Sequence, residues 1–489
     1  MASGTQTGKK ETVSAGGRTI QESSRKKDRK RQKRQQKLVI AAVILILLGA
    51  AYLIGALYFR NHFLPHTVIN GVACGGRNES QSVELFEKRA ADYVLTLQER
   101  NEKTETVAGT DIDLQVHLGD SLGELLENQN GFTWPAHLFG RAEDTVEAAV
   151  EYDQEKLRQA VGKLNCMDSS RMYDSENASL SEYQPGSGYE IVDEVYGTRI
   201  NEDAFYAQLD DAITNFAEEL DLSGTGCYVD PLYTADSAEA QKMLETANRY
   251  VNTTITYQFG EAQEVLDGSV ISQWIRVGDD CSVSLDGEQE AAYISDLASK
   301  YDTKWKSRTF VSHSGKTVTV PAGGNYGWRV DQEGTLEALN GYLESGENYT
   351  GEVVYHQRAA QYGEPDYGNT YVEVSISAQH FWYYQNGTVV LESDFVSGDP
   401  TKGHDTPKGI YRLAYKARDQ VLEGQGYASP VKYWMPFVDG CGFHDADWRD
   451  RFGGSIYKGD GSHGCLNLPP SVAKQLYDMI EAGTAILIY

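Results

Sequence analysis

The sequence predicts a multidomain α+β protein with one N-terminal transmembrane helix, repeated α+β modules and a C-terminal β-rich domain. Three observations support this prediction. A stretch of 22 uncharged residues follows a basic N-terminus, two Gly-rich loops that lead into helices resemble each other, and the last 120 residues alternate with period two around hairpin signals. At 489 residues the chain is too long for one ordinary domain, and three domains are expected.

Charge is divided unevenly along the chain. Residues 1–37 hold twelve Lys or Arg and three Asp or Glu, whereas the remainder holds 32 basic and 68 acidic residues. Residues 1–37 also have almost no large apolar side chains that could form a core, so we expect a disordered basic cytoplasmic tail. The acidic body argues against nucleic-acid binding, because phosphate contacts need clustered cations.

Residues 38–59 are predicted to form a transmembrane helix. The segment contains no charge, and at about 1.5 Å per residue its helix covers the roughly 30 Å hydrocarbon core of a bilayer. Tyr52, Tyr58 and Phe59 fit an outer aromatic belt, and the preceding basic residues predict a cytoplasmic N-terminus with the rest of the chain outside. A cleaved signal peptide is the alternative. An uncleaved anchor is favoured because the apolar run is long and no Ala-x-Ala site follows it.

Residues 60–230 are predicted to be a first α+β module. Residues 66–72 indicate a strand that ends at a turn, residues 82–98 show helical spacing of apolar side chains, and residues 107–118 alternate like a pair of strands.

A second module is predicted at residues 231–364, because parts of both modules resemble each other. In each, a Gly-rich loop is followed by a short strand with Arg and by a helix that starts after Asn201 or Asp331, which are good N-cap residues. Four residues at repeated positions have two alternative roles: contact with a glycan, or packing beneath the repeat helix. Packing is favoured, since repeated positions usually repeat for packing. These residues are Tyr189, Arg199, Trp328 and Arg329.

The last domain is predicted at residues 370–489. Residues 371–377 alternate with period two, and Asn386-Gly387 between β-branched and aromatic runs is a strong hairpin signal. A further strand is expected at residues 410–415, one short helix at 471–482 and a closing strand at 485–489.

Within this domain, Cys465 is a candidate nucleophile. It follows Ser462-His463-Gly464 in a turn of small residues, where the backbone can bend and N–H groups can face a developing oxyanion. His444 lies 21 residues upstream, and a Cys and a His in contact would form a thiolate–imidazolium pair. The alternative is a structural cysteine buried in the core, because free cysteines are among the most buried residues.

The other five cysteines show no CxxC pair and no metal-ligand spacing, so a disulfide framework that spares Cys465 cannot be complete. Cys441 is a core or lid residue in one reading and a disulfide partner of Cys465 in another. The five are Cys74, Cys166, Cys227, Cys281 and Cys441.

The motif Ser462-His463-Gly464-Cys465-Leu466-Asn467, with Gly442-Phe443-His444-Asp445 before it, resembles the signature of L,D-transpeptidases with a YkuD-type catalytic domain. Asn467 departs from the Arg that many members carry there. The repeated modules are similar to peptidoglycan-binding modules that precede such domains in Gram-positive bacteria. The resemblance implies a sandwich-like catalytic fold.

The resemblance assigns Cys465 as the nucleophile and His444 as the general base, oriented by Asp445 or a nearby carbonyl. It implies an oxyanion hole at the N–H groups of Gly464 and Cys465, with Ser462, His463 and Asn467 shaping the site. The stretch before His444 lines the site entrance in the family. Tyr433 and Trp434 are therefore candidate substrate contacts or core residues.

The implied reaction joins peptidoglycan stem peptides. Cys465 attacks the bond between the third stem residue and D-Ala, and an amine from a neighbouring stem resolves the thioester to a 3→3 cross-link that contributes to cell-wall biogenesis and cell shape. The resemblance implies no metal or other cofactor, and carbapenem β-lactams as inhibitors. Alternatives are an L,D-carboxypeptidase, a sortase-like or cysteine-peptidase chemistry, and a wall-binding protein with an inactive domain.

Overall fold

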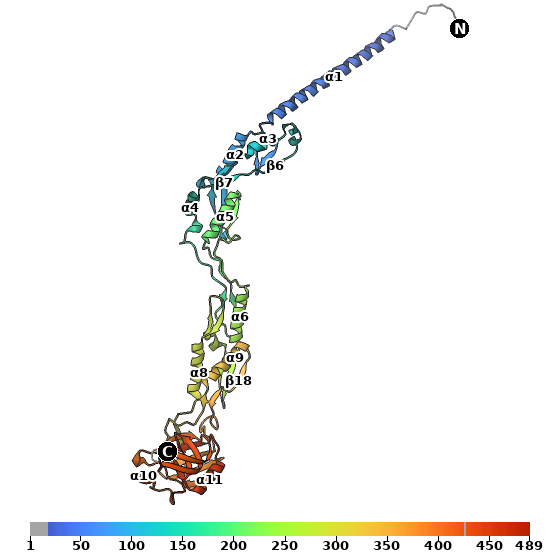
Figure 1. The fold of residues 1–489 in the computed structure, drawn as a ribbon. Helices are drawn as coiled ribbons and strands as arrows, with labels where there is room; N and C mark the ends of the chain where they lie inside the picture. The colour runs from blue at the N-terminus through green and yellow to red at the C-terminus, as the bar shows by residue number, and fades with distance from the viewer. Residues whose placement is uncertain (1–17, 425–426) are drawn as a thin grey trace, which may run out of the picture. The chain divides into compact units, whose positions relative to one another are not determined.

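The computed structural model describes residues 18–424 and 427–489. The chain divides into two compact units (Figure 1). The first holds the chain up to Glu176 together with Val195–Pro231, and the second holds Asn177–Glu194 and Leu232–Tyr489. The first unit ends at Pro231, one residue after the boundary expected at residue 230. Residues 177–194, however, belong to the second unit.

The first unit begins with one long helix, α1 (Arg18–Tyr58), which is long and apolar enough from Arg29 to Tyr58 to cross a membrane. The disorder predicted for residues 1–37 is wrong for residues 18–37, which continue this helix. Lys, Arg, Gln and Glu are good helix formers, and extending an existing helix avoids a new nucleation step. Residues 1–17 lie outside the described part of the chain.

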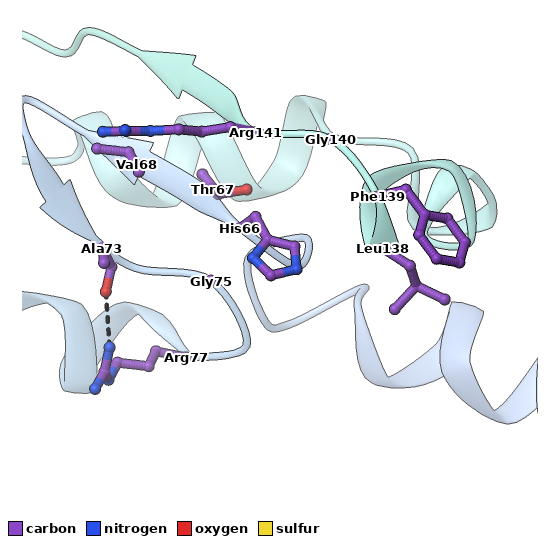
Figure 2. A pocket seen from close by; sticks show the side chains of 10 residues that line it. All are labelled: His66, Thr67, Val68, Ala73, Gly75, Arg77, Leu138, Phe139, Gly140 and Arg141. Carbon is purple, nitrogen blue, oxygen red and sulfur yellow. Dashed lines mark hydrogen bonds between the residues drawn. The ribbon is translucent and has the colours of Figure 1, made fainter.

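After α1, the predicted strand and turn at residues 66–72 are confirmed as β1 (Thr67–Ile69) and β2 (Val72–Ala73). These form a sheet with β6 (Ala142–Asp144). A cavity of about 510 Å³ lies beside this sheet, where Arg77 donates a hydrogen bond to the Ala73 carbonyl (2.7 Å; Figure 2).

The helix predicted over residues 82–98 is shorter than expected. It is α2 (Glu79–Ala91), started by a capping box between Asn78 and Gln81. The β-prone run that follows forms β3 (Val94–Gln98), because it pairs with β4 (Thr104–Ala108) over a buried core.

The strand pair expected at residues 107–118 is also corrected. Its second strand, β5 (Gln115–His117), pairs with β7 (Ala149–Glu151) rather than with β4, because the short helix η2 (Gly109–Ile112) turns the chain between them.

The two units repeat one topology. In the first, α5 (Glu202–Thr214) leads into β10 (Glu219–Asp221), which pairs parallel with β3 of the hairpin β3–β4. In the second, α9 (Gln332–Ser345) leads into β18 (Tyr349–Gly351), which pairs parallel with the first strand of a hairpin, β11 (Ile255–Phe259) and β12 (Ala262–Leu266).

The predicted N-caps of the two repeat helices are confirmed. Asn201 accepts a hydrogen bond from the Ala204 N–H, and Asp331 accepts one from the Gly334 N–H. The loop at residues 185–189, which the sequence suggested as part of the first copy, instead joins β8 (Ser179–Leu180) to β9 (Ile191–Val192) against α6 (Ala238–Val251) of the second unit.

The remaining repeat elements of both units are helices and two-stranded sheets around buried cores. They are α3 (Ser121–Asn128), α4 (Gln154–Val161), α7 (Gly268–Trp274), α8 (Gly287–Tyr301), β13 (Ile275–Val277), β14 (Val283–Leu285), β15 (Arg308–Val311), β16 (Thr317–Val320), β17 (Arg329–Val330) and β19 (Tyr355–Gln357).

The C-terminal part of the second unit is built from two sheets and one helix. The first sheet has the order β22-β21-β20-β28-β23 and the second the order β24-β25-β26-β27. A shared core of buried aliphatic and aromatic side chains joins the sheets and α11 (Pro470–Met479). The strands are β20 (Tyr371–Ser375), β21 (His380–Gln385), β22 (Thr388–Asp394), β23 (Gly409–Arg412), β24 (Ala417–Gly424), β25 (Tyr427–Val438), β26 (Cys441–Asp445), β27 (Leu466–Leu468) and β28 (Ala485–Ile488).

The hairpin signal in this part is confirmed. Asn386 and Gly387 have φ angles of 49° and 79°, the paired positive values of a type I′ turn, and they connect β21 to β22.

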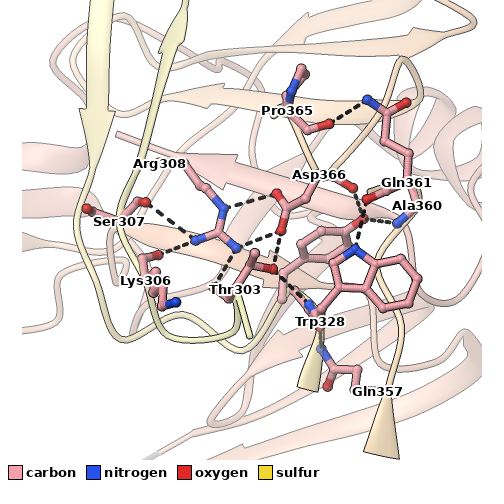
Figure 3. Close-up of polar contacts among 12 residues, drawn as sticks. Thr303, Lys306, Ser307, Arg308, Trp328, Gln357, Ala360, Gln361, Pro365 and Asp366 are labelled. Carbon is pink, nitrogen blue, oxygen red and sulfur yellow. Dashed lines mark hydrogen bonds and ion pairs between the residues drawn. The ribbon is translucent and has the colours of Figure 1, made fainter. Parts of the chain in front are cut away.

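A buried ion pair links β15 to the segment that leads from the repeat module into β20 of the C-terminal part (Figure 3). Arg308 donates to both carboxylate oxygens of Asp366, at 3.0 and 2.7 Å, and also to the carbonyls of Thr303 and Lys306, each at 2.6 Å. Beside it, Phe310 of β15 packs in one cluster with Ile410 and Leu487 of the last sheet.

Candidate active site

The turn at residues 461–465 places Cys465 at the start of β27. Gly464 has a φ of +121°, which only glycine adopts readily, and a Cβ atom there would lie 2.7 Å from the Cys441 sulfur. Ser462 closes the turn, because its Oγ donates to the Cys465 carbonyl (2.6 Å) and accepts from the Gly464 N–H (3.0 Å).

Sheet register brings His444 to this turn. Strands β26 and β27 pair in parallel with His444 opposite Asn467. Side chains two residues apart on a strand share a face, so Cys465 and Asn467 project toward the same side as His444. The sequence predicted the residues, and this long-range pairing explains how they meet.

Two hydrogen bonds hold the buried imidazole of His444. Its Nδ1 lies 2.8 Å from the Asp445 carbonyl oxygen and its Nε2 lies 2.9 Å from Asn467 Nδ2. Since the carbonyl can only accept, Nδ1 carries the proton and Nε2 holds the free electron pair that accepts from the Asn467 amide.

Arg449 fixes that amide. Its Nε donates to Asn467 Oδ1 at 2.9 Å, which leaves the amide nitrogen to face His444. The Asp445 carboxylate does not touch the imidazole; it accepts from the backbone N–H groups of Lys432 and Tyr433, at 2.9 and 2.8 Å. Of the two expected orienting groups, the structure therefore shows the carbonyl.

The thiol of Cys465 lies in the same cavity. Its sulfur is 3.5 Å from the Gly440 carbonyl oxygen, and no hydrogen bond joins it to His444 among the residues the structure describes. Burial raises the pKa of Cys465 to about 12, and an N–H from Gly442 offsets this only in part.

Burial also lowers the pKa of His444, against a smaller opposing effect of the Asp445 carbonyl. The raised pKa of Cys465 and the lowered pKa of His444 both favour a neutral thiol beside a neutral imidazole. The thiolate–imidazolium pair that the sequence suggested therefore stays a prediction: His444 is buried, Cys465 is half-buried, and no hydrogen bond joins the two side chains among the described residues.

A cavity of about 380 Å³ opens onto these groups. It is lined by Cys465, His444 and Asn467 and walled by aromatic side chains. The other residues that line it are Val421, Leu422, Glu423, Ser429, Trp434, Gly440, Trp448, Arg449, Gly461, Ser462 and His463.

Of the two aromatic candidates for substrate contact, only Trp434 lines this cavity. Its ring centroid lies 6.0 Å from that of His444. Tyr433 points to the opposite face of β25, where it packs in the core near Tyr477 at 5.3 Å between ring centroids. The expectation that Tyr433 contacts substrate does not agree with this place in the core.

The two expected oxyanion donors, the N–H groups of Gly464 and Cys465, differ in whether they already donate a hydrogen bond. The Gly464 N–H is engaged by Ser462, so it is not available, whereas the Cys465 N–H has no hydrogen-bond acceptor among the described residues. His463 lines the cavity and packs near His404, with 4.4 Å between ring centroids, and its pKa is lowered by burial and by the neighbouring His404 and Lys402 charges.

Cys441 is a free, buried cysteine in the core beneath the turn. All six cysteines are free, so the structure holds no Cys441–Cys465 disulfide.

The aromatic and cationic residues of the repeats are mostly structural. Trp328 is buried and stacks on Tyr362 at 4.1 Å, Arg199 pairs with Asp174, and the Tyr189 backbone is held by Asn248 at 2.7 and 2.9 Å. These contacts agree with the packing interpretation.

Sequence reasoning missed Arg449, Gly440 and Trp448. Arg449 lies five residues after His444 and is joined to it only through Asn467, so no local spacing rule predicts its role. Trp448 is a large aromatic residue outside the strands, and such residues often line binding sites, so this signal could have found it.

Comparison with known proteins identifies the two parts of the second unit. Residues 369–488 match the family described as "YkuD: L,D-transpeptidase catalytic domain", and residues 233–350 match the "Putative peptidoglycan binding domain". None of the curated proteins compared with the chain matches it.

Solved structures of similar sequence include a cysteine-to-serine mutant of the L,D-transpeptidase of Enterococcus faecium. It is 38% identical, with a TM-score of 0.43, over 51% of this chain and 100% of that chain. The catalytic domain of an E. faecium L,D-transpeptidase acylated by ertapenem is 48% identical, with a TM-score of 0.23, over 25% of this chain and 98% of that chain.

An L,D-transpeptidase from Mycobacterium smegmatis is 25% identical, with a TM-score of 0.21, over 25% of this chain and 58% of that chain. Residues 369–488 match the catalytic-domain family, and the sequence of the solved E. faecium chain is 38% identical to this one over 100% of that chain. The chain belongs to the L,D-transpeptidase family.

Proposed function

We propose that this protein is a membrane-anchored L,D-transpeptidase that forms 3→3 peptidoglycan cross-links through a thioester on Cys465. The observation that supports this most directly is that Cys465 and a buried, carbonyl-oriented histidine, His444, line the same cavity. That combination suits attack on an acyl group.

In the first half-reaction, the Cys465 sulfur attacks the carbonyl carbon of the third stem residue. His444 Nε2, the ring nitrogen with a free electron pair, takes the thiol proton and transfers it to the departing D-Ala amine. The amide bond to D-Ala breaks, and a thioester forms. The free N–H of Cys465 is the proposed oxyanion donor.

In the second half-reaction, the side-chain amine of a neighbouring stem attacks the thioester. Its proton passes to Nε2 and then to the departing sulfur, which restores the thiol and leaves one new amide bond. The number of amide bonds is unchanged, so no other energy source is needed.

The Asn467 amide must give way during proton transfer, because it holds the same electron pair that the thiol proton needs. We propose that substrate entry moves the thiol from the Gly440 carbonyl toward Nε2 while Arg449 keeps the amide within reach. His444 then regains its resting bond after each transfer.

Anchoring by α1 would hold the enzyme at its substrate. The basic residues before the apolar span favour an N-terminus in the cytoplasm and a catalytic domain that faces the cell wall. The match of residues 233–350 to a peptidoglycan-binding family supports the same location.

The test incubates the detergent-solubilised full chain with defined disaccharide-tetrapeptides and follows products by mass spectrometry. We expect released D-Ala and 3→3 dimers, both abolished in Cys465→Ser and retained in the matched control Cys281→Ser, whose cysteine lies outside the cavity. Tripeptide without dimer would identify an L,D-carboxypeptidase instead. Dimers from the Cys465→Ser variant would refute the assigned nucleophile.

A further inference from the structure

The loop at residues 129–140 is an uncharged, apolar segment at the surface of the first unit. Its sequence, QNGFTWPAHLFG, contains no Asp, Glu, Lys or Arg, although these residues make up 24% of the chain. Phe139 is 96% exposed, Phe132 56% and Leu138 42%. Large apolar side chains gathered on one exposed segment mark a contact surface.

This loop packs against the end of α1. The Tyr52 hydroxyl donates to the Phe132 carbonyl, and the Trp134 indole N–H donates to the Tyr52 carbonyl, both at 3.1 Å. A Cβ atom on Gly55 would lie 2.5 Å from the Trp134 ring, so glycine is required for this close approach. The Trp134 ring also stacks on Phe59, with 6.0 Å between centroids.

Further hydrogen bonds fix the start of the loop to the residues just after α1 and satisfy the backbone of the loop itself. Gln129 Nε2 donates to the carbonyls of Phe59 and His62, at 2.5 and 2.6 Å. Two 3₁₀ turns, η3 (Gly131–Thr133) and η4 (Ala136–Leu138), then use backbone groups that would otherwise need water. The loop is therefore suited to a layer poor in water.

The helix residues that it touches set its depth. Tyr52 lies seven residues before Phe59, the last residue of the apolar run, a separation of about 10 Å along a helix. Interfacial segments embed about 5–10 Å into the boundary between headgroups and acyl chains, where aromatic residues are enriched. A loop held beside Tyr52 by a membrane-spanning α1 must reach that boundary.

We propose that residues 131–139 form a second membrane-contacting element, which inserts Phe132, Leu138 and Phe139 into the outer interface of the bilayer. This proposal rests on the proposed anchoring by α1. The partner is the lipid surface, because the loop is continuous with the exposed apolar side of the helix, including Ile54 and Leu57. Figure 2 shows Leu138 and Phe139 side by side at the rim of the cavity next to β1.

The consequence is that the first unit is seated on the membrane rather than tethered by one flexible point. Two contacts, the span and the loop, restrict how this unit tilts against the bilayer. The loop carries none of the residues that line the Cys465 cavity, so its removal should leave catalysis on soluble substrates unchanged.

The experiment uses the full chain in nanodiscs of phosphatidylethanolamine and phosphatidylglycerol. Phe139 is replaced by photoreactive benzoylphenylalanine, and after illumination mass spectrometry identifies what is bound to it. We expect lipid adducts at this position. The matched control places the same probe at Val94, an exposed apolar residue of β3 in the same unit, and should give at least tenfold less lipid adduct.

A second measurement tests the same membrane contact without the photoreactive probe. The triple variant Phe132→Ser, Leu138→Ser, Phe139→Ser should lose at least tenfold of the hydrogen-exchange protection that nanodiscs give to residues 129–140. Its activity on disaccharide-tetrapeptides should match that of the unaltered chain.

The outcomes separate the two proposals. A chain that resists carbonate extraction but gives no lipid adduct at position 139, or a protein adduct in its place, overturns the inference about the loop alone. A chain that carbonate removes from membranes overturns the anchoring by α1 and this inference with it. Neither result bears on the roles of Cys465 and His444.

Discussion

At the scale of single residues, burial sets the protonation of the two central groups. Loss of solvation raises the pKa of Cys465 to about 12 and lowers that of His444, and both shifts favour the neutral forms of the two groups. The nucleophile is then generated during the reaction rather than stored as a thiolate. A neutral thiol is also oxidised more slowly than a thiolate.

This state predicts a specific pH dependence for thiol alkylation. Because the thiolate is the reacting form, the rate of Cys465 alkylation by iodoacetamide should rise by about tenfold per pH unit between pH 7 and 9. The rate is measured by mass spectrometry of the peptide that contains Cys465. A plateau near neutral pH would show a preformed thiolate and contradict the raised pKa.

Arg449 is predicted to act as a positioning residue. Arg449→Leu leaves Asn467 Oδ1 without a donor in a buried site, which costs about 1–3 kcal/mol and frees the amide to rotate. We expect kcat for dimer formation to fall by roughly 10- to 100-fold with little change in KM. The control is Arg451→Leu, because Arg451 is exposed and lies outside the cavity.

A steady-state assay with tetrapeptide substrate distinguishes this role from a structural one. If Arg449→Leu lowers thermal stability but leaves kcat of the folded fraction unchanged, the hydrogen-bonded chain from Arg449 to His444 has no part in catalysis. Recovery of part of the activity in Arg449→Lys would agree with donation to Asn467.

At the scale of elements, the turn before β27 depends on one glycine. Gly464→Ala places a side chain at a φ of +121° and 2.7 Å from the Cys441 sulfur, and backbone strain of this kind costs about 1–3 kcal/mol. We expect a lower Tm and loss of acylation by a carbapenem, because the turn that presents Cys465 must shift.

Gly341→Ala is the matched comparison for this change. Gly341 lies inside α9 with open space around its missing side chain, so alanine should leave the stability unchanged or raise it by about 0.5–1 kcal/mol. If Gly464→Ala retained full acylation and an unchanged Tm, the turn would tolerate another conformation than the one described.

At the scale of the second unit, the Arg308–Asp366 pair should stabilise the junction between the repeat module and the catalytic domain. Both side chains are largely buried, so Arg308→Met leaves an unpaired buried carboxylate, which costs about 3–5 kcal/mol. Denaturant unfolding of the purified chain measures this loss. Replacing Asp366 by Leu as well should restore much of it, since the charge is then gone.

The more exposed pair Arg276–Asp286, with side chains 52% and 24% accessible, provides the control for this prediction. Exposed ion pairs contribute roughly 0–1 kcal/mol, so Arg276→Met should change the unfolding free energy little. Equal effects of Arg308→Met and Arg276→Met would mean that the junction does not depend on the buried pair.

Much of the whole molecule could be predicted because many of its elements depend only on local sequence patterns. The apolar run at residues 38–59, the Asn386-Gly387 turn and the N-caps Asn201 and Asp331 each require only neighbouring residues, and the structure contains all of them. Local pattern failed for residues 94–98, where helical spacing continues but pairing with β4 makes a strand.

What the sequence determined by itself is the set of chemical groups and their order: an apolar span, two similar modules, and a Ser-His-Gly-Cys turn after a Gly-Phe-His segment. What only the tertiary structure decided is how those groups are placed and charged. The assignment of residues 177–194 to the second unit, the link from Arg449 to His444 through Asn467, and the raised pKa of Cys465 all depend on contacts between distant segments. Such contacts determine which side chains are buried and which hydrogen-bond partners they have. Neither can be read from the spacing of residues along a chain.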